Sequence, residues 1–350
     1  MRMRMPLPYA GRMSSLHIDM MKIAQSVGVS QSTVSRALAD KPGVSARTRS
    51  RVLTAARELG YSRSAAASRL ATGTTDTVAL VVNHPERWYQ SAVIAHAASL
   101  LQGAGLDVLV YNISNPRQRD AVLGGQHLGG RADGILIVSA SLTVVEEEAL
   151  ATSRLPTVGI GTVLDRFAFV TVDNESEIAA GVQYLLGLNH QRIGLIQGTT
   201  EGSRPDYVTQ ERGHGFRRAM GDRFDDDLVV RVLGDDAEAG GSGLAALLSR
   251  RQPPTAVVAE TDTLAAGVLQ AARRSGIRIP SNLSVLGFDD NPIADLLDLT
   301  TLRQYPQAQA ERATQMLLDD LHAGAITKDF ILLPTTLIVR GTTQHLTQAR

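Results

Sequence analysis

Residues 23–61 read IAQSVGVSQSTVSRALADKPGVSARTRSRVLTAARELGY and hold three helical patterns in close succession. Apolar residues recur at helical spacing, and Gly28 predicts the end of the first helix. Ser30 and Ser45 predict the N-caps of the second and third helices. Because only a short, Gly-containing turn separates the first two patterns, the stretch predicts a helix-turn-helix.

The charge of the chain is unevenly distributed. The formal net charge is zero, but residues 1–75 hold twelve Lys and Arg against three Asp and Glu, a surplus of nine that the remaining residues offset. This asymmetry indicates a module that binds a polyanion, joined to a body of opposite charge. A basic surface kept for solubility is the alternative.

The second helix has a polar outer face that includes Gln31, Ser32, Ser35 and Arg36. Gln and Arg make bidentate contacts with adenine and guanine edges, and hydroxyls suit phosphates or either base type. The pattern therefore favours DNA binding, although a solvated amphipathic helix would look the same.

The stretch from Ile23 to Tyr61 resembles the DNA-binding headpiece of the lactose/galactose-repressor (LacI/GalR) family. The match runs in register through GVS, TVSR, VS, TR and ELGY. Asp19 stands where the family usually has Thr, and Lys22 where it usually has Asp, so we leave Asp19 out of the expected contacts. The resemblance implies base contacts by Gln31, Ser32 and Arg36 and phosphate contacts by Ser30, Thr33, Ser35 and Ser45.

The stretch SRSAAASRLATGTT at 62–75 is a short Ala-rich pattern followed by a linker. In the resembling family it is a hinge helix that orders on DNA and inserts a Leu into the minor groove, which kinks the duplex. Ala67 and Leu70 match the small residue and the Leu of that hinge. Arg63-Ser64 replaces the usual Pro-Asn, and a passive linker is the alternative.

From Thr77 onward, short apolar runs alternate with helical patterns. TVALVV, DVLVYN, GILIVS, PTVGIG and VTVD form a first series of expected buried parallel strands, and RIGLIQ, LVVRVLG, AVVAE and LSVLGFDD form a second. This alternation predicts an α/β fold of two doubly wound lobes. A ligand cleft is expected at the carboxyl ends of the strands.

Polar and aromatic residues gather where these strands end. Carboxylates, a guanidinium and aromatic rings suit a small polyhydroxylated ligand, because rings stack on its apolar faces and charged groups bind its hydroxyls. Asp173 and Asp262 are also plausible helix caps. The residues expected in the cleft on these grounds are Trp88, Tyr89, Asp173, Arg212, Thr261, Asp262, Phe288 and Asp289.

The body also resembles the family's effector-binding and dimerisation core, which is similar to periplasmic sugar-binding proteins. The resemblance covers about residues 17–344 and implies effector contacts at Asp173, Arg212, Asp289 and Gln304. Thr261 stands where the family usually has Asn, so an ordinary hexose is not assured as effector. The apolar stripe of the helix expected at 306–322 fits the core and a dimer interface equally well.

The resemblance implies a homodimeric repressor that reads a palindromic operator in double-stranded DNA under the control of an effector. Induction and corepression both remain open. The expected segments are a basic tail (1–16), a helix-turn-helix domain (17–62), a hinge and linker (63–75) and a core (76–344), with an N-lobe of about 76–172 and 304–330 and a C-lobe of about 173–303 and 331–344.

Other classes find little support. The chain has no cysteine, its eight histidines are scattered, and it lacks a Walker A, zinc-type, GxSxG or dinucleotide-binding motif. We therefore expect no catalytic residue, metal or cofactor. A free solute-binding protein would need a signal peptide and would have no use for the basic headpiece, whereas an architectural DNA-binding protein remains an alternative.

The basic start lacks the apolar run of a signal peptide, and Met13 is an alternative start. No apolar run is long enough to span a membrane. We expect a cytoplasmic, nucleoid-associated protein without membrane contact.

Overall fold

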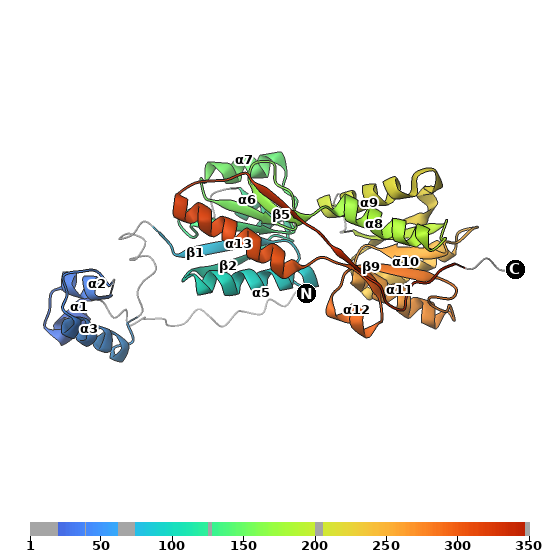
Figure 1. Cartoon of the computed structure of the whole chain (residues 1–350). Helices are drawn as coiled ribbons and strands as arrows, with labels where there is room; N and C mark the ends of the chain where they lie inside the picture. The colour runs from blue at the N-terminus through green and yellow to red at the C-terminus, as the bar shows by residue number, and fades with distance from the viewer. Residues whose placement is uncertain (1–19, 39, 62–73, 125–127, 200–205, 347–350) are drawn as a thin grey trace, which may run out of the picture. The chain divides into compact units, whose positions relative to one another are not determined.

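The computed structural model describes residues 20–38, 40–61, 74–124, 128–199 and 206–346 (Figure 1). The chain divides into two units, a headpiece that ends at Gly73 and a core that begins at Thr74.

The described part of the headpiece contains three helices at the positions that the sequence predicts. Gly28 adopts a φ of 70°, which glycine reaches at low cost, and so allows the tight turn between the first two helices. Ser45 caps the third helix, because its hydroxyl accepts a hydrogen bond from Thr48 N at 3.2 Å. The helices are α1 (Met20–Val27), α2 (Gln31–Leu38) and α3 (Ala46–Glu58), and they enclose Ile23, Ala24, Val27, Val34, Ala37, Val52 and Ala56.

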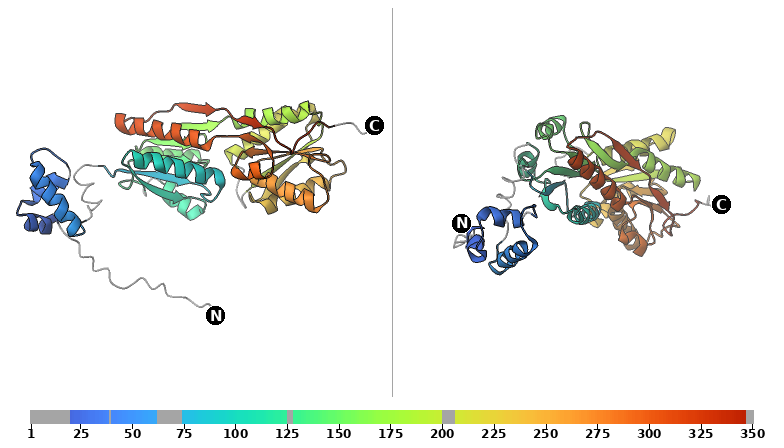
Figure 2. Two further views of the ribbon diagram at one scale, coloured as in Figure 1. Left: turned by 60° about the horizontal axis from the view of Figure 1, so that its bottom comes forward. Right: turned by 60° about the vertical axis from the view of Figure 1, so that its left-hand side comes forward.

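The described residues of the core form two six-stranded sheets, one in each lobe, with helices on both faces (Figures 1 and 2). Two faces covered by helices leave no polar side for the central strands, so these read as continuous apolar runs. The strand 77–82, for example, is buried along its whole length. The α/β architecture with two doubly wound lobes is therefore confirmed.

The N-lobe sheet is parallel throughout, in the order β11-β5-β4-β3-β1-β2. One face packs against α5 and α13, and the other packs against α6 and α7. The strands are β1 (Thr77–Val82), β2 (Asp107–Asn112), β3 (Gly134–Val138), β4 (Thr157–Ile160), β5 (Ala168–Val172) and β11 (Phe330–Leu333), and the helices are α5 (Trp88–Gly103), α6 (Pro116–Leu123), α7 (Val144–Thr152) and α13 (Pro306–Ala323).

The C-lobe sheet has the order β12-β10-β9-β8-β6-β7, and only β12 among these strands runs antiparallel to its neighbour. Helices α10 and α11 cover one face, and α8 and α9 cover the other. The strands are β6 (Ile193–Thr199), β7 (Val229–Leu233), β8 (Ala256–Ala259), β9 (Ser284–Asp289), β10 (Thr300–Arg303) and β12 (Thr336–Ile338), and the helices are α8 (Asn174–Gly187), α9 (Tyr207–Met220), η1 (Gly221–Arg223), η2 (Asp226–Leu228), α10 (Ala237–Leu248), α11 (Asp262–Arg274) and α12 (Pro292–Leu296).

Three sequence-based expectations are refined by these elements. The last crossing between lobes lies between Leu333 and Thr336 and not at 330–331, because β11 pairs with β5 of the N-lobe. Strand β2 is an edge strand with exposed side chains and not a buried one. The apolar stripe of α13 belongs to the core, since Ala310, Ala313 and Leu317 are fully buried against the N-lobe sheet.

Substitution of Gly215 by Ala should destabilise the core. A Cβ atom there would lie 2.1 Å from the carbonyl oxygen of Glu175 in α8, and overpacking of this kind costs about 1 to 3 kcal/mol. Gly213→Ala in the same helix is the control, because its Cβ would meet Gln197 at an ordinary 3.5 Å and Ala favours helix by about 1 kcal/mol. Urea unfolding measures both; an unchanged midpoint for G215A would contradict the close packing of α8 and α9.

Candidate nucleic-acid interface and ligand cleft

Helix α2 presents a polar outer face. Val34 and Ala37 are buried in the headpiece, whereas Gln31, Ser32 and Arg36 are exposed. The structure thus leaves accessible the three side chains that are expected to contact bases.

Hydroxyl groups surround the starts of α2 and α3. Ser30 Oγ accepts a hydrogen bond from Thr33 N at 3.1 Å and lies 2.8 Å from Thr33 Oγ1, while Ser45 caps α3. Ser35 is exposed on α2. Helix N-termini carry free backbone N–H groups and partial positive charge, so these two ends suit the phosphates of a DNA backbone.

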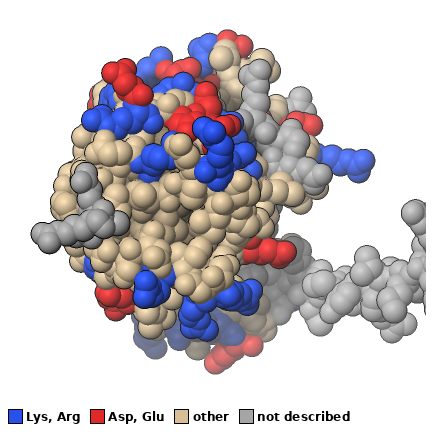
Figure 3. Space-filling view, turned by 90° about the vertical axis from the view of Figure 1, so that its right-hand side faces the viewer, with Lys and Arg blue, Asp and Glu red and all other residues tan. Residues whose placement is uncertain are grey.

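The described headpiece residues carry seven Lys and Arg against two acidic residues. Some of these cations hold the fold, since Arg49 pairs with Asp40 and Arg51 donates to the carbonyl oxygen of Val27 at 2.8 Å. On the face of the core in Figure 3, by contrast, Lys and Arg are interspersed with Asp and Glu. The described headpiece thus carries a surplus of five positive charges.

Three residues of the sequence analysis lie outside the described residues: Asp19 before α1, and Ala67 and Leu70 in the expected hinge. The expectations for them stay predictions.

A cleft separates the two lobes of the core at the carboxyl ends of their strands. Its cavity has a volume of about 100 Å³. Among the described residues, Arg87 Nε lies 3.8 Å from Asp235 Oδ2 across the cleft, and Tyr207 N donates to Ser141 Oγ at 2.9 Å. A sugar-sized ligand would require the lobes to separate or side chains to move.

Arg212 is the central cation of the cleft, and it is only 4% exposed. Its Nε donates to Asn174 Oδ1 at 3.0 Å, and its Nη1 donates to the carbonyl oxygen of Glu260 at 2.6 Å. The guanidinium also stacks on the ring of Phe288, 3.6 Å from the centroid. These contacts fix the guanidinium plane with one side toward the cleft.

Asp289, Gln304 and Tyr89 line the cleft as expected. Gln304 Nε2 donates to Asp289 Oδ1 at 2.5 Å, and Tyr89 Oη donates to Gln309 Oε1 at 2.6 Å. Burial, and then the negative charge of Asp262, raise the pKa of Asp289. Burial, and then the charge of Asp289, raise the pKa of Tyr89.

Trp88 and Thr261 also line the cleft, one from each lobe. Thr261 is the N-cap of α11, where its hydroxyl accepts from Leu264 N at 3.2 Å. The same hydroxyl donates to Asp235 Oδ1 at 2.5 Å. Thr261 thus orients the carboxylate of Asp235 in the cleft. The Asn that is usual in the family at this position would instead point its own amide into the cleft.

Three expected cleft residues do not line the cleft and serve the fold instead. The carboxylate of Asp173 caps α8 by accepting from Ser176 N at 2.9 Å. Asp262 is fully buried and accepts from Thr301 Oγ1 at 2.6 Å and Asn291 N at 2.9 Å, so it joins α11 to the neighbouring loops. Phe288 is buried beneath Arg212.

Four charged residues line the cleft that the sequence analysis did not single out. Asp206 caps α9, Asp235 and Glu260 follow β7 and β8, and Arg87 precedes α5. The sequence carries a signal for these four residues, because each lies close to the end of a strand or the start of a helix, where cleft residues are expected. Glu260 closes the expected strand AVVAE, and Asp235 directly follows the expected strand LVVRVLG.

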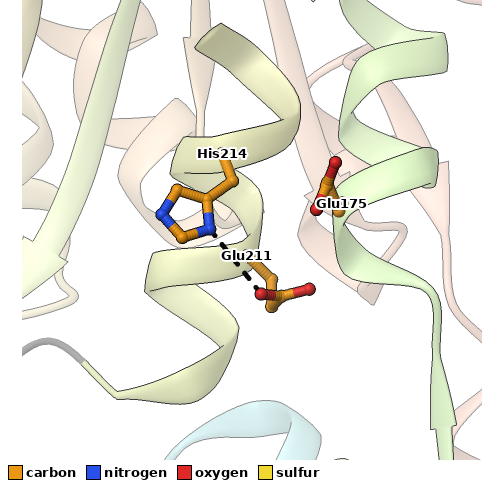
Figure 4. Close-up of side chains that lie close together, drawn as sticks. All are labelled: Glu175, Glu211 and His214. Atoms are coloured by element: carbon orange, nitrogen blue, oxygen red, sulfur yellow. Dashed lines mark ion pairs between the residues drawn. The ribbon is translucent and has the colours of Figure 1, made fainter. Parts of the chain in front are cut away.

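One group of possible metal-ligating side chains occurs among the described residues, on the surface of α8 and α9 (Figure 4). Glu211 and His214 lie one turn apart on α9, with His214 Nδ1 3.7 Å from Glu211 Oε1, and Glu175 lies opposite on α8. Glu175 pairs with Arg218 at 2.7 Å, and His214 is 65% exposed. An exposed set with one ligand already paired does not enclose an ion.

Comparisons with known proteins match both units of the chain. Residues 19–64 match bacterial regulatory proteins of the lacI family, and residues 182–343 match the periplasmic binding protein-like domain. The chain is 30% identical over 339 residues to the HTH-type transcriptional repressor CytR of Escherichia coli (strain K12), which covers 93% of this chain and 96% of the relative. This chain belongs to the LacI family. It is a DNA-binding transcriptional regulator.

Further members of the LacI family agree. The HTH-type transcriptional regulator AglR of Rhizobium meliloti is 31% identical and covers 93% of this chain and 94% of the relative. The Lac repressor dimer bound to operator and the anti-inducer ONPF matches with a TM-score of 0.81 at 25% identity, over 93% of this chain and 99% of that chain. These relatives are regulators and not enzymes. None of the described helices has the length and apolar composition needed to cross a bilayer.

The stability of this LacI-family protein should depend on pH through Glu260. Burial raises the pKa of Glu260 from 4.5 to about 7. The folded state then binds the Glu260 proton more tightly than the unfolded state does. Proton binding therefore stabilises the fold fully below the pKa of Glu260 in the unfolded state, and this stabilisation is lost as pH rises through its pKa in the folded state. Over that pH range, the free energy of unfolding of the wild type should fall by about 3 kcal/mol relative to that of Glu260→Gln, which cannot ionise.

Chemical unfolding across a pH series measures this difference. Parallel pH profiles for the wild type and E260Q would show that Glu260 titrates alike in both states.

Proposed function

We propose that this protein is a repressor that binds a palindromic operator as a homodimer, under the control of a small polar metabolite in the cleft. The observation that carries the proposal is the exposed face of α2, where Gln31, Ser32 and Arg36 project from a helix anchored by Val34. Side chains of these types read base edges in the major groove. Action on DNA also implies a location at the nucleoid.

The relatives support each part of this proposal. CytR is named a repressor. The Lac repressor is described as a dimer bound to operator, and the regulator CelR, with a TM-score of 0.69 at 25% identity, as a complex with cellobiose. By analogy, Ala67 and Leu70 would meet the minor groove, and Arg212, Asp289 and Gln304 would contact the effector. Effector and operator would then be coupled by about 1 to 3 kcal/mol.

An apolar surface of the core offers a dimer interface. Val110 on the edge strand β2 is 50% exposed, and Leu296 on α12 is 84% exposed. Figures 1 and 2 place β2 and α12 on the same side of the core. Edge strands with exposed apolar side chains pair readily with another chain, and we assign this surface to a second copy.

A gel-shift comparison tests the repressor proposal against the architectural alternative. The full-length protein should bind its palindromic operator far more tightly than random DNA of the same length, by about a thousandfold or more. Equal affinity for both DNAs would support an architectural protein.

Arg36→Ala should weaken operator binding by about 1 to 3 kcal/mol and relax the preference at one base pair of each half-site. The cause is the loss of a bidentate contact with guanine. Arg57→Ala removes the same charge from α3 and serves as the control. A loss that is equal across all operator variants would show that Arg36 contacts only phosphate.

Val110→Asp should shift the protein from dimer toward monomer in sedimentation equilibrium, because it would bury a charge in the interface. Val145→Asp is the matched control, since Val145 is 73% exposed on α7, a helix that Figure 1 shows on the opposite side of the core from β2 and α12. An unchanged mass for V110D would remove β2 from the dimer interface.

A further inference from the structure

Three carboxylates gather on the C-lobe side of the cleft. Asp206 precedes α9, Asp235 follows β7, and Glu260 follows β8. The strands β8, β6 and β7 are adjacent in the sheet, so the segments at their carboxyl ends meet at one edge. All three residues line the cleft.

The described lining of the cleft has an excess of negative charge. Its cations are Arg87 and Arg212, against the carboxylates of Asp206, Asp235, Glu260 and Asp289. Arg212 is already held by Asn174, the Glu260 carbonyl and Phe288, and Arg87 lies 3.8 Å from Asp235 alone. With all four carboxylates ionised, the formal charge of this lining is minus two, which a cationic ligand would balance.

Glu260 bears part of the cost of this imbalance. It is 4% exposed, and one carboxylate oxygen accepts from Gly198 N at 3.0 Å. Burial raises its pKa to about 7, the charge of Arg212 lowers it, and the charges of Asp206 and Asp235 raise it. A cation placed among these groups would recover part of the free energy lost when they were removed from water.

We infer that the cleft selects a ligand with a protonated amine on a hydroxylated ring, of the amino-sugar class, whose ammonium group lies among Asp206, Asp235 and Glu260. Trp88 lines the same cleft and offers an aromatic face for the ring. A neutral sugar of the same shape leaves the carboxylates uncompensated, and an anionic ligand is repelled. This inference rests on the proposed effector role of the cleft.

Isothermal titration of the full chain with D-glucosamine, D-galactosamine and D-mannosamine, each beside its neutral hexose, tests the inference. At least one amino sugar should bind about tenfold or more tightly than its hexose. An opposite charge within about 4 to 6 Å shifts the pKa of a carboxyl group by about one unit or more, and a shift of one unit corresponds to a tenfold change in affinity. Equal affinity within every pair, tighter binding of the hexoses, or no binding of any amino sugar would overturn it.

Two variants link the preference to these carboxylates. Glu260→Gln and Asp206→Asn remove one charge each and should reduce the preference for the amine about tenfold, with Asn retaining the helix cap of α9. Glu238→Gln, at an exposed position on α10, should leave it unchanged. A preference that survives both cleft variants would overturn the inference.

Gel shifts with the same compounds separate this inference from the proposed function. A neutral hexose that changes operator affinity would overturn the amino-sugar inference and leave the repressor proposal standing. Absence of any operator preference would overturn the repressor proposal itself.

Discussion

The burial of one guanidinium group determines how the cleft is built. Removing the charge of Arg212 from water is costly unless hydrogen bonds and opposite charges compensate it. The fold supplies Asn174 from α8, the carbonyl of Glu260 after β8 and the ring of Phe288 from β9, so a single side chain on α9 joins four elements. The charge of Arg212 also stabilises the ionised forms of Glu260 and Asp289 and so lowers the free-energy cost of burying these carboxylates in the cleft.

The main architecture could be predicted because it depends on local and repetitive signals. Helical spacing, two serine caps and one glycine turn specify the headpiece, and continuous apolar runs reveal strands buried on both faces. Strand β2 shows the limit of that logic. Its middle residues, VLVY, form an apolar run like those of the central strands, but its place at the sheet edge depends on the order of strands, which no local pattern encodes.

The cleft was predictable only in part, because the direction of a side chain at a strand end depends on its neighbours. Thr261 and Asp262 are adjacent, yet Thr261 faces the cleft and Asp262 turns inward to Thr301 and Asn291. Glu260 is the last residue of the expected strand AVVAE, yet it lines the cleft. Residue type and position after a strand located the cleft, but tertiary packing decides which polar groups line it and which are buried in the fold.

A chain of hydrogen bonds connects the acidic side of the cleft to the N-lobe. Gln304 donates to Asp289, Gln309 Nε2 donates to the Gln304 carbonyl at 3.0 Å, and Tyr89 donates to Gln309. A ligand shifts a conformational equilibrium only as far as it binds two states differently. A ligand that engages Asp289 competes with Gln304, and a buried amide left unpaired costs about 1 to 3 kcal/mol. That cost is of the same order as a typical coupling free energy between two sites. These hydrogen bonds end on Tyr89 of α5 and Gln309 of α13.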